Sequence, residues 1–307
     1  GAREGRGKQG RQKAPQTDPQ AGPARLRGES LEVRACREQA SEGILPNKPM
    51  KIHEPNAELV ARQDWTDGLA TFSVRPLDWE FPTFVPGQFT NLALPEGDDW
   101  DAETGANIRR AYSIASTPGA ETVDFFIRRV DDGALTPRLF DLPIGGKLFL
   151  EQRCAGHFTL TGAADSEDLV LVGTGTGVAP YRPMLYDRSA RARFGRTIIL
   201  YSDRYVRDLG YVDEFRELED ESFRFFPTIT GEEPADAWDG LRGRVNKFLE
   251  PEAYKALTGK PLSPDRCQIF LCGNPQMIVD VQEKLAPLGF QRHRKRDPGQ
   301  LHMEKYW

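Results

Sequence analysis

The 307-residue sequence is poor in cysteine and histidine, with four of each. The cysteines stand at positions 36, 154, 267 and 272, a spacing that matches no disulfide framework, zinc site or iron–sulfur site. No two of the histidines have the spacing that places two ligands on one helix face. We therefore expect that this chain binds no metal ion.

Long apolar runs and an excess of positive charge are also missing. No stretch approaches the roughly 18 apolar residues of a membrane-spanning helix, and no apolar signal region follows the N-terminus. The net charge of −5 is unlike that of a dedicated nucleic-acid-binding protein, which is basic. These absences predict a cytoplasmic protein that binds neither membranes nor nucleic acid.

The first 49 residues differ in composition from the rest of the chain. They hold ten Lys and Arg against six Asp and Glu, with many Gly, Pro and Gln and almost no periodic apolar residues. Such a segment cannot bury enough surface to offset chain entropy, so we predict that residues 1–49 are a disordered extension. Our hypothesis is that the natural chain starts at Met50; because the segment before it carries +4, residues 50–307 carry −9.

Short apolar runs separated by Gly, Pro and Asp turns occupy residues 58–152. Their period-2 character predicts an antiparallel β-barrel. The predicted strands cover 58–62, 70–75, 88–94, 110–116, 122–130 and 147–152. A short helix is predicted over 136–142, with Thr136 as its N-cap and Pro137 at its first position.

From residue 168 onward, strands alternate with helices. Near-continuous apolar runs at 169–172, 197–201, 223–229 and 268–271 are typical of strands that are buried on both faces. Helices are predicted over 178–189, 211–219, 245–250 and 275–288. The pattern predicts an α/β parallel sheet. The polar segment 160–167 is the expected boundary, which gives one domain over 50–163 and another over 164–307.

The ends of the predicted parallel strands carry the most distinctive motifs. GTGTGVAP at 173–180 is neither the standard dinucleotide fingerprint nor a P-loop, but its glycines allow close backbone approach of a ligand. The next strand ends in Asp203 and Arg204, where an acid suits NAD and an arginine suits NADP; Arg207 and Arg244 add positive charge. Cys272 lies at the same expected ligand-binding edge of the sheet, where a buried structural cysteine is the alternative.

Two further motifs could face a flat or phosphorylated ligand. Strand alternation puts Arg110 and Tyr112 on one side and Ser113 on the other; arginine binds diphosphates and tyrosine stacks on planar rings. The alternative is a half-exposed strand with a core tyrosine. The chain ends in Tyr306 and Trp307, which either fill a core or cover a flat ligand.

Together these motifs resemble those of the bacterial-type ferredoxin/flavodoxin–NADP reductases. The resemblance covers residues 52–307 and rests on RAYS at 110–113, GALTPRLF at 133–140, GTGTGVAP at 173–180, LRGR at 241–244, LCGNPQM at 271–277 and the terminal EKYW. It implies that the barrel binds FAD, that the parallel sheet binds NADP(H), and that the protein passes electrons to ferredoxin or flavodoxin. Hydride would move from nicotinamide C4 to flavin N5, followed by one-electron steps to the carrier.

The resemblance also implies a role for particular residues. Arg110 would bind the FAD diphosphate, while Tyr112 and Tyr306 would stack on the two faces of the flavin. Residues implied to bind FAD are Arg110, Ala111, Tyr112, Ser113, Ile127, Arg128, Val130, Ala134, Leu135, Thr136, Thr176, Tyr306 and Trp307. Residues implied to bind NADP(H) are Gly175, Thr176, Arg204, Arg244 and Cys272. The implied catalytic residues are Ser113, Cys272, Glu304 and Tyr306.

One departure from the family pattern concerns coenzyme choice. Where the family usually has Ser-Arg-Glu after the third parallel strand, this chain has Thr230, Gly231 and Glu232. Loss of that arginine weakens the expected preference for NADPH, because a charge-assisted hydrogen bond contributes about 1.5–3 kcal/mol. It keeps open an NADH-linked reductase component of an oxygenase system. A third possibility is a flavin-binding partner protein without catalysis.

The expected protein partners are acidic. Ferredoxins and flavodoxins would dock on basic side chains near the flavin, and the candidates are Arg128, Arg129 and Arg138. We expect the protein itself to be a monomer.

Overall fold

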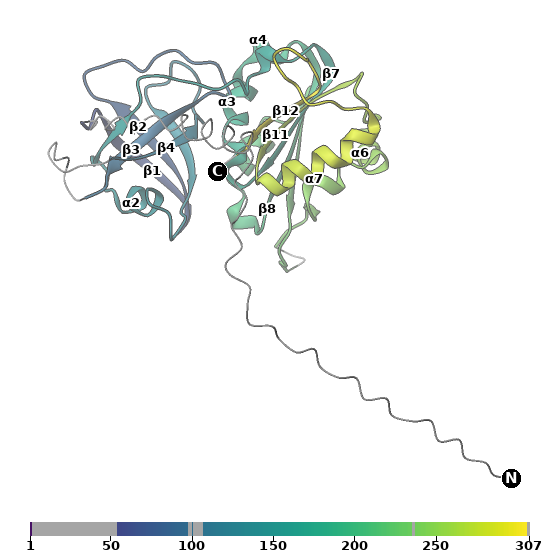
Figure 1. Cartoon of the computed structure of the whole chain (residues 1–307), viewed down its shortest axis with the longest axis horizontal. Coiled ribbons are helices and arrows are strands. Elements are labelled where there is room, and N and C mark those ends of the chain that lie inside the picture. Colours follow the sequence, from purple (N-terminus) through teal and green to yellow (C-terminus); the bar gives the residue numbers. More distant parts are fainter. Residues whose placement is uncertain (2–53, 98–99, 101–106, 235–236, 306–307) are drawn as a thin grey trace, which may run out of the picture. The chain divides into compact units, whose positions relative to one another are not determined.

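The computed structural model describes residue 1 and residues 54–97, 100, 107–234 and 237–305. These residues form one antiparallel and one parallel sheet, each of six strands (Figure 1). The two-part fold predicted from the sequence is confirmed. The segment 1–49 and the terminal Tyr306 and Trp307 lie outside the described residues, so what was predicted of them stays a prediction.

The antiparallel sheet is the barrel. Its strands are β1 (Ala57–Thr66), β2 (Leu69–Pro76), β3 (Phe89–Pro95), β4 (Asn107–Ser113), β5 (Val123–Arg128) and β6 (Lys147–Leu150). They pair in the order β4-β3-β6-β1-β2-β5. The two edge strands meet just beyond β4, where Ala115 N donates to Asp124 O at 2.8 Å. This contact brings the sheet close to closure.

Strand alternation sorts the residues of the barrel. On β2, Ala70, Phe72 and Val74 point into the barrel core, which also holds residues of the helix α2 (Thr136–Asp141). The predicted N-cap of α2 is wrong, because the helix begins at Thr136 and Leu135 is the N-cap. The Thr136 hydroxyl instead bonds to the backbone of Val130, 2.9 Å from its N and 3.2 Å from its O.

The parallel sheet has a reversal in its strand order. Its strands are β7 (Ser166–Thr174), β8 (Phe194–Asp203), β9 (Phe223–Ile229), β10 (Leu241–Arg242), β11 (Cys267–Gly273) and β12 (Leu301–Lys305). The order is β10-β9-β8-β7-β11-β12. The chain moves outward from β7 to β10 and then returns to the other side of β7. Ligands bind such sheets at the carboxyl ends of the strands beside this switch point, here between β7 and β11.

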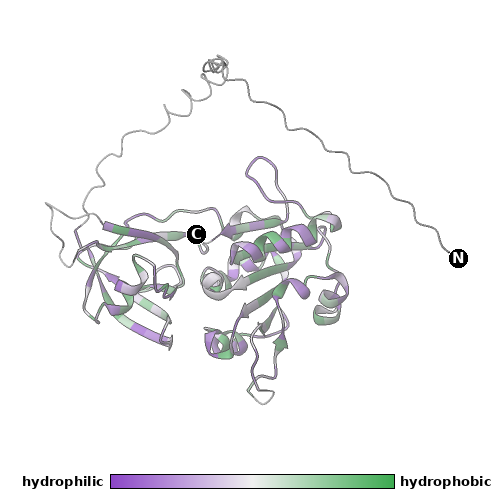
Figure 2. Ribbon diagram, turned by 60° about the horizontal axis from the view of Figure 1, so that its bottom comes forward, coloured by the Kyte–Doolittle hydropathy of each residue, from purple (hydrophilic) through white to green (hydrophobic). Residues whose placement is uncertain are grey.

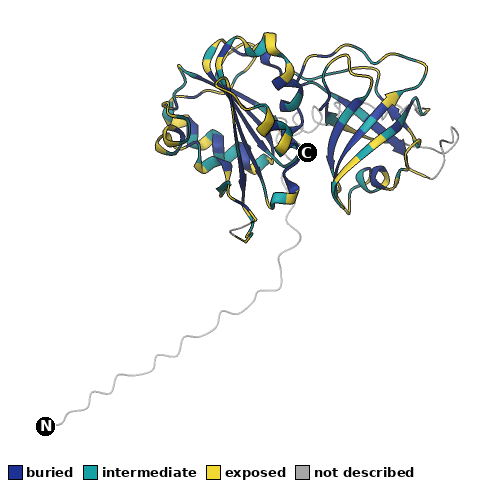
Figure 3. Ribbon diagram, turned by 180° about the vertical axis from the view of Figure 1, so that it is seen from behind, coloured by how far each residue is buried: buried dark blue, intermediate teal, exposed yellow. Residues whose placement is uncertain are grey.

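Both faces of the parallel sheet are covered, as the apolar runs predicted. Leu169 and Leu171 of β7 share a core with α3 (Tyr181–Tyr186) and α5 (Val212–Glu217). Val170 and Val172 share another with α6 (Pro251–Thr258) and α7 (Pro275–Leu285). The strands of this sheet are accordingly largely hydrophobic in Figure 2 and buried in Figure 3.

Several helices differ from their predicted extents. The stretch predicted as one helix over 178–189 is broken into η2 (Gly175–Val178), α3 and α4 (Arg188–Arg191), where Asp187 ends α3 and accepts from Ala190 N to cap α4. Residues 245–250 contain only the 3-10 turn η4 (Val245–Lys247). The remaining 3-10 turns are η1 (Leu160–Gly162), η3 (Val206–Asp208) and η5 (Ala286–Leu288). The elements α6, β10 and β12 were not predicted. Among the described residues, none of the helices has the length and apolar character needed to cross a membrane.

Candidate active site

A partly buried carboxyl group lies where the barrel meets the parallel sheet. Glu304 is on β12, beside Cys272 on β11, and Ser113 ends the barrel strand β4. Ser113 Oγ donates to Glu304 Oε2 at 2.9 Å, and Cys272 Sγ lies 4.0 Å from the same oxygen. Burial raises the pKa of Glu304 to about 7, while the hydrogen bond from Ser113 opposes this shift. The carboxyl can therefore exchange a proton near neutral pH.

The structure thus brings together three of the four predicted catalytic residues. Ser113 and Glu304 are 191 positions apart in the sequence and still share a hydrogen bond. The fourth, Tyr306, is outside the described residues, although it follows two positions after Glu304.

Along strand β4 the residues become progressively more buried from Arg110 to Ser113. It lies at the edge of the barrel sheet, so one side of its backbone has no neighbouring strand in the ladder. Arg110 and Ala111 are exposed, Ser113 is buried, and Tyr112 is half-buried against Phe125, with the ring centroids 6.4 Å apart. Burial raises the pKa of Tyr112, so its ring stays neutral at all ordinary pH values. An exposed cation and a neutral aromatic ring therefore precede the buried Ser113.

The segment after β5 offers mainly backbone atoms to a ligand. Ile127 and Leu135 have their side chains in the barrel core, which leaves only their main-chain atoms for a ligand. Val130 is 43% exposed, and Ala134 is exposed as well. Because Thr136 ties its hydroxyl to Val130, this segment has a defined conformation.

A cavity of about 440 Å³ opens at the carboxyl ends of the parallel strands. Its walls come from Arg128 of the barrel and from the loops after β7, β8, β9, β10 and β11, and they include Thr174, Gly175, Thr176, Arg204, Arg244 and Asn274. The predicted residues Gly175, Thr176, Arg204 and Arg244 therefore line one cavity, whereas the buried Cys272 is not in its wall. Thr174 and Asn274 were not predicted.

Glycines allow the two loops beside the switch point to touch. A Cβ on Gly177 would lie 2.3 Å from Cys272 O, and one on Gly273 would lie 2.4 Å from Thr174 Oγ1. Gly273 also has a φ of +124°, which disfavours other residues. The glycines of the GTGTGVAP motif thus have a packing role as well as the predicted role toward a ligand.

Asp203 is a candidate for binding the ribose of NAD, but both of its carboxylate oxygens already form polar contacts within the protein. Its Oδ2 lies 2.7 Å from Arg128 Nη2 of the barrel, and its Oδ1 accepts from Arg204 N at 2.7 Å. Burial raises the pKa of Asp203 to about 6, and Arg128 opposes the shift. This carboxylate joins the barrel to the parallel sheet, which leaves it poorly placed to bind a ribose.

The three predicted docking arginines differ in their surroundings. Arg128 also faces Asp208, with Nη1 3.6 Å from Oδ1, so its charge is largely neutralised. Arg129 lies 3.3 Å from the exposed Asp131. Arg138 donates to Gly97 O at 3.2 Å and is exposed.

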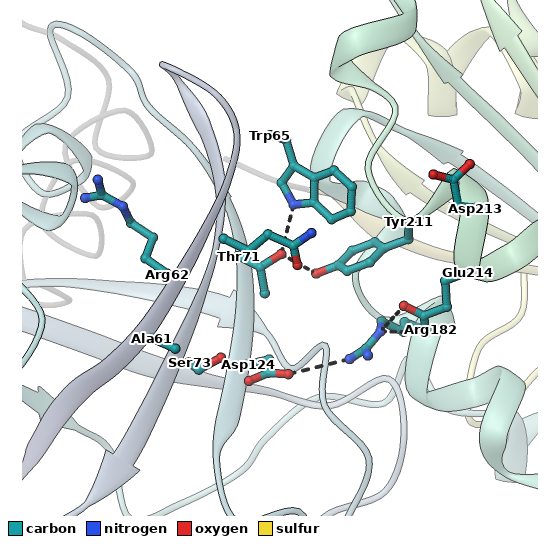
Figure 4. A pocket seen from close by; sticks show the side chains of 11 residues that line it. Ala61, Arg62, Trp65, Thr71, Ser73, Asp124, Arg182, Tyr211, Asp213 and Glu214 are labelled. Atoms are coloured by element: carbon teal, nitrogen blue, oxygen red, sulfur yellow. Dashed lines mark hydrogen bonds and ion pairs between the residues drawn. The ribbon is translucent and has the colours of Figure 1, made fainter.

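A second cavity, of about 460 Å³, lies between the barrel and the parallel-sheet domain (Figure 4). Arg182 joins the two, since its Nε is 2.8 Å from Glu214 Oε1 and its Nη1 is 3.5 Å from Asp124 Oδ2. Tyr211 OH lies 2.8 Å from Thr71 Oγ1 across the same junction. The sequence carries no local signal for these contacts, because each depends on residues far apart in the chain.

Within the described ranges, no three or more His, Cys, Asp or Glu side chains come together in a way that could hold a metal ion.

Comparison with known proteins gives consistent matches. A family model described as "Oxidoreductase NAD-binding domain" matches residues 171–283. The flavodoxin/ferredoxin–NADP reductase of Shigella flexneri is 33% identical over 248 residues, which is 80% of this chain and 95% of that protein. Ferredoxin–NADP reductase A of Sorangium cellulosum is 31% identical over 252 residues, 78% of this chain and 86% of that protein. The crystal structure of a Neisseria gonorrhoeae ferredoxin NADP+ reductase with bound FAD and NADP covers 82% of this chain and 98% of its own, with a TM-score of 0.74 at 28% identity.

A barrel, a doubly wound sheet with a cavity at its switch point, and a partly buried carboxyl group at their junction define a two-domain oxidoreductase. Given its identity to the proteins above, this chain belongs to the flavodoxin/ferredoxin–NADP reductase family. The family predicted from the sequence motifs is confirmed.

Proposed function

We propose that this protein transfers electrons between NADP(H) and a ferredoxin or flavodoxin through bound FAD. The observation that carries the proposal is the Ser113–Glu304–Cys272 cluster, because it places a carboxyl group of raised pKa where the two nucleotide sites meet. Such groups are typical of sites at which protons and electrons move together.

The barrel residues fit an FAD molecule. Arg110 is exposed on an edge strand and has no ion pair with any residue in the described part, so it is free to bind a diphosphate. Tyr112 offers a neutral ring for stacking. We assign the further contacts, largely through the backbone, to Ala111, Ser113, Ile127, Arg128, Val130, Ala134, Leu135 and Thr136. When bound, FAD supplies hydride acceptance from the nicotinamide and single-electron transfer to the carrier.

The switch-point cavity is the proposed site for NADP(H). Gly175 and Thr176 would contact the coenzyme where it approaches the barrel, and Arg204 and Arg244 would bind its 2′-phosphate. Cys272 would contact the nicotinamide end from within the sheet. The side chains of this site orient the coenzyme and exclude water from it. Tyr306 and Trp307 keep their predicted stacking roles.

The proposed part played by Glu304 is to hold a proton. Its Oε2 accepts from Ser113 Oγ and lies next to Cys272 Sγ, so a proton on the carboxyl group can pass to or from the Ser113 hydroxyl. With a pKa of about 7, the group is present in both protonation states at neutral pH.

Partner and assembly proposals follow from the same family. Arg129 and Arg138 stay candidates for docking an acidic carrier, whereas Arg128 is engaged with Asp203. We also propose a cytoplasmic monomer in which residues 50–163 bind FAD, residues 164–307 bind NADP(H) and residues 1–49 are a disordered extension. Light scattering after gel filtration tests the monomer.

The test of the function uses the purified protein with its flavin. We expect FAD to be released on denaturation, and NADPH to drive reduction of a flavodoxin or ferredoxin. Ser113→Ala and Glu304→Gln should slow that reduction without loss of FAD. A protein that holds FAD but does not oxidise NADPH or NADH with any acceptor would contradict the proposal.

One observation favours a second candidate, the NADH-linked reductase component of an oxygenase system. Gly231 stands where the family usually has an arginine for the 2′-phosphate. A comparison of kcat/KM for NADH and NADPH separates the two candidates. Parity or a preference for NADH would favour the second.

A further inference from the structure

Two arginines share one aromatic ring beside the switch-point cavity. The guanidinium carbon of Arg204 lies 5.2 Å from the ring centroid of Tyr205, and that of Arg207 lies 4.9 Å from it. Arg204 lines the cavity, and Arg207 follows within the short turn η3. Cation–π contacts of this kind hold guanidinium groups in place at little entropic cost once the ring is fixed.

Gly231 makes room for this ring. A Cβ at position 231 would lie 2.7 and 2.9 Å from ring carbons of Tyr205 and 2.6 Å from Arg204 O. Gly231 N also donates to Arg204 O at 2.7 Å, which holds the two loops together. The position of the missing family arginine is therefore occupied by the packed ring of Tyr205. No side chain fits there unless the loop after β8 moves.

The positive charge gathered here is not neutralised by the protein. Arg204, Arg207 and Arg244 are exposed, and none forms an ion pair with a described residue. Of the two carboxylates that line the cavity, Asp203 pairs with Arg128, and Asp280 accepts a hydrogen bond from the neutral Gln276 Nε2 at 2.8 Å. Arg204 and Arg244 line the cavity, and Arg207 shares the Tyr205 ring with Arg204; arginines without a carboxylate partner favour an anion, and a phosphate in particular.

We propose that Arg207, packed on Tyr205 next to Arg204, determines coenzyme specificity by binding the 2′-phosphate of NADP(H). The site then requires glycine at position 231, because a side chain there would displace the Tyr205 ring on which Arg204 and Arg207 pack. This inference rests on the proposed function. Arg207, in the loop after β8, takes the place of the arginine that the chain lacks after β9. The chain therefore prefers NADPH in spite of Gly231.

The first test is Arg207→Gln in the full-length holoprotein. We expect kcat/KM for NADPH to fall about tenfold through KM, with kcat and the NADH kinetics unchanged, as loss of one charge-assisted hydrogen bond implies. Calorimetric binding of 2′,5′-ADP should weaken by a similar factor, and binding of 5′-AMP should stay the same. Arg224→Gln is the matched control, because Arg224 also packs on a ring, Phe226 at 5.5 Å, and lies near the amino end of β9, at the edge of the sheet opposite the cavity.

A second variant tests the requirement for glycine. Gly231→Arg restores the family residue but collides with Tyr205, so we expect weaker rather than tighter binding of 2′,5′-ADP. Equal 2′,5′-ADP affinity in Arg207→Gln and Arg224→Gln, or a gain in Gly231→Arg, would overturn the inference. The binding measurement needs no turnover. A protein that binds 2′,5′-ADP through Arg207 but reduces no carrier would contradict the proposed function alone.

Discussion

The hydroxyl groups of Thr71 and Tyr211 lie 2.8 Å apart and join the barrel to the parallel-sheet domain. Thr71 also accepts from Trp65 Nε1 at 3.1 Å (Figure 4). The Tyr211 ring packs on Trp65 and Phe126. Tyr211 has a φ of +63°, an uncommon value for a residue with a side chain. Such a conformation persists only where neighbouring residues impose it. At Tyr211 these neighbours are the aromatic side chains of the barrel.

Tyr211→Phe should lower stability without changing the fold. The variant keeps the ring packing and loses one buried hydrogen bond, which costs about 1 kcal/mol and lowers Tm by roughly 2–4 °C in a protein of this size. Thermal unfolding of the holoprotein measures the shift. Tyr186→Phe is the control, because that hydroxyl donates to Glu214 from a largely exposed position and its loss should have little effect. Equal shifts in both variants would contradict a special role for the Thr71–Tyr211 contact.

Glu304 should make stability depend on pH in a particular direction. Its folded pKa of about 7 is above the ordinary value of 4.5, so the folded state binds the proton more tightly than the unfolded state. The stabilisation is fully present below pH 4.5 and is lost as pH rises through 7, on the order of 3 kcal/mol in all. Glu304→Gln does not titrate, so its stability relative to the wild type should increase from pH 4.5 to pH 8. Urea unfolding at these two pH values measures the difference, and parallel profiles would refute the expectation.

Removing the hydroxyl of Ser113 should shift the titration of Glu304. The hydrogen bond from Ser113 lowers the pKa of Glu304, so Ser113→Ala should raise it further and move the pH dependence of hydride transfer to higher pH. The rate itself should fall by about 10²-fold, the size of a typical acid–base contribution. Stopped-flow flavin reduction from pH 5 to 9 gives both quantities. Ser113→Thr retains a hydroxyl and should keep the midpoint of the wild type; an unchanged midpoint in Ser113→Ala would exclude the coupling.

Asp203→Asn tests whether this residue supports the structure or selects the coenzyme. Burial disfavours the charged form of Asp203, and its pair with the partly exposed Arg128 offsets only part of that cost, so we expect the free energy of unfolding at neutral pH to change by less than about 1 kcal/mol. The kcat/KM values for NADH and NADPH should change by the same factor. A selective loss with NADH would show instead that Asp203 binds the ribose.

Much of the fold and part of the site were predictable from local patterns. The apolar run 169–172 predicted a strand buried on both faces, and its alternate residues indeed enter two different cores. Tyr112 packs against the barrel core, whereas the neighbouring Ser113 bonds to Glu304 of the parallel sheet. By contrast, β12 was missed because its sequence, LHMEK, is largely polar. Its buried His302 is accommodated by stacking on Phe270, with the centroids 4.2 Å apart, and by a 3.0 Å hydrogen bond to Gln268.

The sequence by itself determined the two kinds of sheet, most of their strands and the motifs at the strand ends, because period and turn chemistry are local properties. Only the tertiary structure decided which of these residues meet. Ser113 and Glu304 share a hydrogen bond, and Arg128 forms an ion pair with Asp203, because packing brings together strands that are far apart in the chain. The steric reason for glycine at position 231 also came only from the structure, because it depends on the Tyr205 ring that packs against this position.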